Sequence, residues 1–214
     1  MARRTKQEAE QTRNAVLTAA AQVFLERGVA RATLEEVAQA AGVTRGAVYW
    51  HFRDKLDLFL AIADRARAPY EGLLTDLAER LAADPALDPF AELEKTVEAG
   101  FQALEANAER QRFLTILMQR CEYVEEMKPA FERQRRARAL FRAELEQIFF
   151  IIAARGRLAA PWRPKETAAA IHLTLYGLLQ TWLESPQDYR LTVEGFALAR
   201  VCLASLDAGR RSEA

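Results

Sequence analysis

Residues 33–55 read TLEEVAQAAGVTRGAVYWHFRDK, and the fold is decided within this stretch. Thr33 followed three residues later by Glu36 predicts a capping box at the start of a short helix, and Gly42 ends that helix. After the turn, Thr44 can cap a second short helix. Two short helices joined through a glycine turn are typical of a helix-turn-helix, whose second helix enters the major groove of DNA.

The second helix, from Arg45 to about Phe52, carries side chains of two kinds. Val48 and Phe52 are four residues apart, so they share one face and point inward. The outward positions are Arg45, Gly46, Tyr49 and Trp50. An outward pair of large aromatic residues is unusual on a surface that meets only water. This helix is therefore predicted to meet a partner.

The rest of the chain also predicts helices, because apolar residues recur at helical spacing and no segment alternates convincingly with period two. These helices are expected from about Gln7 to Arg27, from Lys55 with a break near Ala68, from Pro89 to Leu104, from Phe113 to Cys121, through Phe141 to Ile152, and from Pro164 and Thr192 onward. The prediction is an all-α protein with a three-helix DNA-binding domain over residues 1–54 and a larger helical bundle over residues 55–214.

Composition narrows the classes of protein further. The 214 residues contain 30 basic and 30 acidic side chains, and this zero net charge argues against a purely electrostatic binder of nucleic acid. Cys121 and Cys202 are isolated, so neither a disulfide framework nor a metal site is expected. The longest wholly apolar run, residues 148–154, is too short to span a bilayer, and no signal peptide opens the chain. A cytoplasmic protein without a membrane partner is expected.

Residues 33–55 resemble the signature of the TetR family of transcriptional regulators, T-x-x-x-[IV]-A-x-x-A-G-V-[ST]-x-G-x-[LIV]-Y-x-H-F-x-x-K. The opening Arg3-Arg4-Thr5-Lys6 and the approach GVARAT over residues 28–33 are similar to the AcrR-type branch, which represses multidrug efflux pumps. The motif resemblance covers roughly the first 60 residues, and beyond them only length and helix order match. It implies a repressor that binds a double-stranded, palindromic operator as a homodimer.

The resemblance also implies roles for single residues, and each has a physical reason. Hydroxyls and free amides at helix N-termini can hold phosphates, arginine can read guanine, glycine allows close approach, and alanine can touch a thymine methyl group. The implied phosphate contacts are Thr33, Thr44, Tyr49, His51 and Lys55, the implied base contacts are Arg45, Gly46 and Ala47, Trp50 is expected at the DNA edge, and Arg3, Arg4 and Lys6 are expected to form a flexible arm. The alternatives are that Tyr49 and His51 only pack or cap, and that the arm is only solvated.

Residues 167–183 contain no charged side chain if His172 is neutral, so their helix must be buried nearly all round. In a small helical domain that burial requires a second surface. Ala168, Ala169, Ala170 and Gly177 would let another helix approach, and Val193, Phe196, Ala197 and Val201 give the last helix a similar face. A symmetric four-helix interface between two subunits is therefore predicted.

Polar residues within these apolar helices suggest a ligand pocket, because a buried polar group needs a partner. The candidate lining is Phe101, Thr115, Met118, Gln119, His172, Tyr176 and Gln180. Such a cavity would take an apolar, multi-ring inducer such as a drug, a dye or a plant phenolic, and no cofactor. Alternatively, His172 and Tyr176 satisfy each other within the core or the dimer seam.

Several other functions are alternatives to a drug-responsive repressor. An enzyme lacks support, because no catalytic or nucleotide-binding motif is present. A regulator of metabolic or fatty-acid genes, a DNA-binding module without ligand control, and an activator are all compatible with the sequence. The basic cluster Arg133, Arg135, Arg136, Arg138 and Arg142 is interpreted as a solvated face in preference to a second nucleic-acid site.

Overall fold

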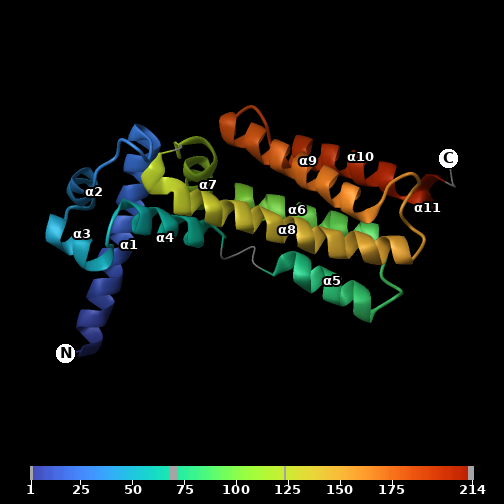
Figure 1. Ribbon diagram of the computed structural model, residues 1–214, viewed down its shortest axis with the longest axis horizontal. Coiled ribbons are helices and arrows are strands. Elements are labelled where there is room, and N and C mark those ends of the chain that lie inside the picture. The colour runs from blue at the N-terminus through green and yellow to red at the C-terminus, as the bar shows by residue number, and fades with distance from the viewer. Residues whose placement is uncertain (1, 68–71, 123, 212–214) are drawn as a thin grey trace. The chain divides into compact units, whose positions relative to one another are not determined.

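The computed structural model describes the backbone of residues 2–67, 72–122 and 124–211, and the side chains of residues 6–65, 72–122 and 124–209. Within these ranges the chain is helical, and the one extended pairing is an isolated antiparallel bridge between Leu158 and Asp207. The helices are α1 (Ala2–Arg27), α2 (Leu34–Ala41), α3 (Arg45–His51), α4 (Lys55–Arg67), α5 (Leu73–Ala83), α6 (Pro89–Glu105), α7 (Ala108–Gln119), α8 (Lys128–Ala154), α9 (Pro164–Glu184), α10 (Phe196–Leu206) and α11 (Ala208–Arg211) (Figure 1). The predicted all-α fold is confirmed.

The chain divides into two compact units. The first contains Met1–Pro69 and Glu109–Arg133, and the second contains Tyr70–Ala108 and Gln134–Ala214. The first unit therefore combines α1 to α4 with α7 and the first turns of α8. The assignment of functions to residues 1–54 and 55–214 stays a prediction.

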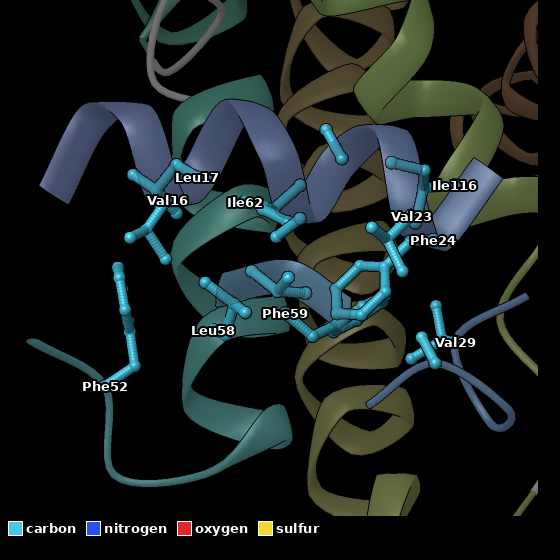
Figure 2. Packing of buried hydrophobic residues seen from close by; sticks show 14 of the residues in the cluster. Val16, Leu17, Val23, Phe24, Val29, Phe52, Leu58, Phe59, Ile62 and Ile116 are labelled. Atoms are coloured by element: carbon cyan, nitrogen blue, oxygen red, sulfur yellow. The ribbon is translucent and has the colours of Figure 1, made fainter. Parts of the chain in front are cut away.

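The core of the first unit lies between α1, α4 and α7 (Figure 2). Val16, Phe24 and Leu58 are completely buried there, and the rings of Phe24 and Phe59 lie 6.5 Å apart between centroids. Ile116 brings α7 into the same cluster. Burial of each large side chain contributes about 1.5 to 3 kcal/mol, so this core fixes α1 and α4 as the support for the two short helices.

The second unit is built from α5, α6, most of α8, and α9 to α11. Asp88 caps α6 by accepting hydrogen bonds from the Phe90 and Ala91 amides, with Pro89 in the first turn, as predicted. Arg157 pairs with the buried Asp207 at 2.8 Å and so links the segment after α8 to the end of α10. In Figure 1, α9 and α10 run side by side.

Four helix boundaries differ from the sequence prediction. Helix α7 begins at Ala108 and not near Phe113. The first helix, α1, begins at Ala2 and not near Gln7, because the polar residues before Gln7 continue the helix although they carry no apolar stripe to reveal it. The long helix α8 begins at Lys128, so the arginine cluster lies on this helix. A five-residue π-helical turn, Leu191–Gly195, precedes α10. The break predicted near Ala68 lies outside the described residues.

Candidate nucleic-acid interface

The α2–turn–α3 segment is fixed by its caps. The Thr33 hydroxyl accepts a hydrogen bond from the Glu36 amide at 3.2 Å, and the Glu36 carboxylate accepts one from the Thr33 amide at 2.9 Å, which confirms the capping box. Gly42 ends α2 with φ of 66°, a left-handed conformation that favours glycine. The Thr44 hydroxyl then accepts from the Ala47 amide at 3.2 Å and starts α3.

The side chains of α3 divide as the sequence predicts. Val48 is completely buried, and Phe52, directly after the helix, is nearly so. Tyr49 and Trp50 are 45% and 72% exposed, and Arg45 and Gly46 are exposed beside them. The inner face of α3 is therefore held by the core of the first unit, while a row of arginine and aromatic side chains is open to a partner.

Arg45 is held in place on this open face. Its guanidinium donates a hydrogen bond to the Tyr49 hydroxyl at 3.3 Å and lies 5.4 Å from the centre of the Tyr49 ring. The Glu35 carboxylate on α2 lies 3.5 Å from the same guanidinium. Sequence reasoning did not identify Glu35, because α2 and α3 carry these two residues without any local spacing that links them. The arginine predicted to read a base is thus restrained before DNA binds.

His51 is neutral at physiological pH. Burial and the nearby Arg13 guanidinium lower the pKa of His51, with Glu10 opposing them. Its ring meets the Trp50 ring edge-on, with centroids 4.5 Å apart. A neutral ring can still donate an N–H hydrogen bond to a DNA phosphate, and contact of His51 with a phosphate stays a prediction.

Acidification should destabilise the protein between about pH 7.5 and 5.5. The pKa of His172 is also lowered, by burial and by Arg142 and Arg138 on α8. Since both folded-state pKa values lie below the unfolded value of about 6.5, the unfolded state binds more protons as the pH falls. The stability that the two neutral rings contribute is therefore complete well above pH 6.5 and is lost as the pH falls through about 6.5. Denaturant unfolding across this range should show the decline, and His51→Gln with His172→Gln should flatten it. An unchanged slope in the double variant would refute this assignment.

The other predicted DNA contacts have the following positions. Thr33 and Thr44 use their hydroxyls as helix caps. Ala47 is partly buried on α3. The side chain of Lys55 is only 17% exposed, and its ammonium lies 2.7 Å from both the Ala30 carbonyl oxygen and the Glu126 carboxylate. The backbone of Arg3, Arg4 and Lys6 is helical as part of α1, so the predicted flexible arm is wrong. The side chains of Arg3 and Arg4 lie outside the described residues. DNA contact by each of these residues stays a prediction.

The residues predicted to line a ligand pocket are divided between the two units. Thr115, Met118 and Gln119 lie on α7 in the first unit. The others, Phe101, His172, Tyr176 and Gln180, lie on α6 and α9 in the second unit. The structure brings His172 and Tyr176 together edge-on, with ring centroids 6.4 Å apart, and the Phe141 ring lies 5.7 Å from the His172 ring between centroids. A shared pocket for the whole set stays a prediction.

Two hollows in the units do not involve these residues. The first is an open groove of about 490 Å³ in the first unit, lined in part by Arg13, Asp57 and Arg133. The second is a cavity of about 10 Å³ in the second unit, lined in part by Val97 and Ile171, with room for about one water molecule. Neither matches the predicted apolar pocket in size and lining.

A capped helix-turn-helix with an open Arg-Tyr-Trp face defines a helical DNA-binding regulator. Comparisons with known proteins agree. Residues 16–62 match the family of bacterial regulatory proteins called the tetR family, and residues 88–207 match the C-terminal region of MAATS-type transcriptional repressors. The chain belongs to the TetR family of transcriptional repressors.

Relatives match along almost the whole chain. The transcriptional repressor BepR of Brucella suis is 42% identical over 207 residues, covering 96% of this chain and 97% of BepR. The crystal structure of NalD, the secondary repressor of the MexAB-OprM multidrug efflux pump in Pseudomonas aeruginosa, has a TM-score of 0.81 and 37% identity, with 94% of this chain and 98% of NalD covered. The complex of SmeT with triclosan has a TM-score of 0.77 and 28% identity, with 94% of each chain covered. No helix among the described residues is long and apolar enough to cross a membrane.

Proposed function

We propose that this protein is a cytoplasmic repressor that binds a palindromic operator as a homodimer, controls a multidrug efflux operon and is released by an apolar small molecule. One observation supports the DNA-binding part above all others. The buried Val48 anchors α3, while Arg45, Tyr49 and Trp50 of the same segment stand open to solvent. An α-helix presented in this way fits the major groove, where arginine can bind guanine with two hydrogen bonds.

Gly46 supports a close approach of DNA to α3. Glycine inside a helix costs about 1 kcal/mol relative to alanine. A Cβ atom added at Gly46 would meet only the Thr44 hydroxyl oxygen, at 3.9 Å, so the protein's own packing does not exclude a side chain there. The glycine is explained if the space is needed by a base or a phosphate.

An open apolar face supports the homodimer. Leu173 on α9 and Val201 on α10 are 68% and 67% exposed, and Val193 and Leu198 add to this surface. Gly177 lies on the exposed side of α9, and nothing surrounds the position that its Cβ would take. Apolar surface of this kind on neighbouring helices is normally covered by a partner, and two copies related by a twofold axis would cover each other's.

Release by an apolar ligand is supported by the relatives and by unsatisfied polar atoms. Triclosan, bound by SmeT, is an apolar compound with two aromatic rings. Gln119 Nε2 and Gln180 Oε1 are buried without a hydrogen-bond partner among the described residues, so both could hold polar groups of a ligand. A ligand that prefers the DNA-free state by about 1.4 kcal/mol would weaken operator binding roughly tenfold.

The inducer should be found by operator release. Apolar multi-ring compounds, triclosan among them, should displace the wild-type protein from its operator in a gel-shift titration. The variants Met118→Ala and Tyr176→Ala should need higher concentrations, whereas Leu140→Ala, a change at an exposed position on α8, should respond like the wild type. If no compound releases the operator, ligand control is wrong. If both pocket variants respond like the wild type, the proposed lining is wrong.

A further inference from the structure

Lys55 lies at the start of α4, and its side chain points inward within the first unit. The ammonium donates a hydrogen bond to the Ala30 carbonyl oxygen at 2.7 Å. It also forms an ion pair with the Glu126 carboxylate at 2.7 Å, and only 17% of the side chain is exposed. A charge-assisted contact at this distance is among the stronger hydrogen bonds in proteins. The Lys55 charge is therefore compensated within the protein.

The segment that follows α7 also forms hydrogen bonds with the loop between α1 and α2. The Ala30 amide donates to the Glu122 carboxylate at 3.0 Å, and the Val29 amide donates to the Arg120 carbonyl oxygen at 2.9 Å. Both polar backbone groups of Ala30 are thus bound by side chains from outside the loop. We call Lys55, Glu122 and Glu126, with the backbone that they hold at Ala30, the Ala30 clamp.

The Glu122 carboxylate packs closely against the loop at Gly28. Gly28 has φ of 78°, a left-handed conformation that favours glycine, and a Cβ atom there would lie 2.3 Å from a Glu122 carboxylate oxygen, so a side chain at this position would displace that carboxylate. Burial acts to raise the pKa of Glu122, but the Ala30 hydrogen bond and the charges of Arg31 and Lys55 outweigh it and lower that pKa. Glu122 is therefore ionised at neutral pH and acts as an anionic acceptor.

The clamped loop leads directly into the helix-turn-helix. Thr33, the cap of α2, follows Ala30 by three residues, and the Ala32 amide donates to the Gly28 carbonyl oxygen at 3.2 Å within the loop. From α2, the Val43 amide bonds to the Ala38 carbonyl oxygen at 3.1 Å and sets the turn to α3. The position of this loop therefore sets the position of α2, and α2 in turn sets the position of α3.

We propose that Lys55 is a positioning residue that holds the loop before α2, together with Glu126 and Glu122, and does not neutralise a DNA phosphate. This inference rests on the proposed operator binding. It differs from the role that the family resemblance implies for Lys55, and the two roles predict opposite effects at Glu126. If the ammonium bound phosphate, Glu126 would compete for it, and removing its charge would strengthen DNA binding. If the ammonium positions the loop, removing that charge loosens the clamp and weakens binding.

The test is a titration of operator DNA at several salt concentrations with the full-length wild type, Lys55→Met, Glu126→Gln and the double variant. Glu125→Gln is the matched control, because Glu125 is the exposed neighbour of Glu126, carries the same charge and pairs with Lys128. Lys55→Met and Glu126→Gln should each weaken binding by about 2- to 30-fold, the range for residues that act without touching the ligand. The double variant should lose no more than the weaker-binding single variant.

The salt dependence separates the two roles. A phosphate contact contributes about one unit per protomer to the slope of log affinity against log salt. Lys55→Met should leave this slope unchanged. A slope reduced by about one per protomer, or tighter binding by Glu126→Gln than by Glu125→Gln, would overturn the clamp.

Hydrogen exchange measured without DNA tests the clamp independently of operator binding. Hydrogen exchange at the Val29 and Ala30 amides should be faster in Lys55→Met and Glu126→Gln than in the wild type and Glu125→Gln, because both amides lie in the clamped loop. Equal exchange in all four proteins would refute the clamp even if the operator were never found. Failure of the wild type to bind any operator would refute the proposed function and leave this result standing.

Discussion

Leu173→Glu should convert the protein into a folded monomer that has lost specific operator binding. Leu173 is 68% exposed on α9, and in a twofold interface each substitution occurs twice. Burying a leucine contributes about 1.5 to 3 kcal/mol, so the pair removes about 3 to 6 kcal/mol before any cost of burying two carboxylates. Sedimentation should show a dissociation constant at least a hundredfold higher, and a gel-shift titration should show a parallel loss of operator affinity.

Leu140→Glu is the matched control for that variant. Leu140 lies on α8, is 67% exposed and receives the same new charge, but it lies outside the proposed α9–α10 interface. It should remain dimeric and bind operator normally. If both variants stayed dimeric, or if the wild type were monomeric at micromolar concentration, the proposed interface would be wrong.

Arg45→Ala should cause the largest loss of sequence-specific binding among variants of α3. Two hydrogen bonds from one arginine to guanine contribute about 1 to 3 kcal/mol, and a dimer loses them in both half-sites. The fold should be unaffected, because the Arg45 contacts with Tyr49 and Glu35 lie on the exposed face. Circular dichroism should therefore match the wild type while operator affinity falls at least tenfold.

The base that Arg45 reads can be identified by substituting operator positions one at a time. At the correct position, the base change should weaken the wild type but have little further effect on Arg45→Ala, because the contact is already gone. A variant that loses affinity equally for every DNA sequence would place Arg45 on a phosphate. Equal binding by variant and wild type would remove Arg45 from the interface.

The helix-turn-helix could be predicted from sequence because its signals are local. The capping box of Thr33 with Glu36, the left-handed Gly42 and the Thr44 cap all act within four residues, and each is present in the structure. The buried and exposed sides of α3 also follow from helical periodicity alone. The start of α1 was missed since polar residues continue that helix without an apolar stripe.

The burial of the uncharged stretch of α9 was predicted in part. Burial on nearly all sides was expected, and Ile171 and Leu178 are indeed buried, but Leu173 and Gly177 remain open in the single chain. Sequence composition predicted that a second subunit covers part of this helix, but it does not show which residues stay open in the single chain. The exposed fractions in the structure identify the open face.

The contacts of Lys55 could not have been predicted. Ala30 and Glu122 are 92 residues apart, and Lys55 meets Glu126 only because the segment after α7 packs beside the α1–α2 loop. No spacing rule relates such residues, and family resemblance alone directed Lys55 to a phosphate. Long-range polar contacts of this kind depend on tertiary packing and become visible only in the structure.

The central claim is that two copies of α3 read one palindrome, and a hydroxyl-radical footprint tests it most directly on the DNA upstream of the gene. A dimer should protect two half-sites whose centres lie about 34 to 36 Å apart, or a multiple of that distance. In the Leu173→Glu variant both protected half-sites should be lost at the same time. In the Leu140→Glu variant both should remain protected. Protection of a single half-site by a monomer, or no protection anywhere upstream, would contradict the account.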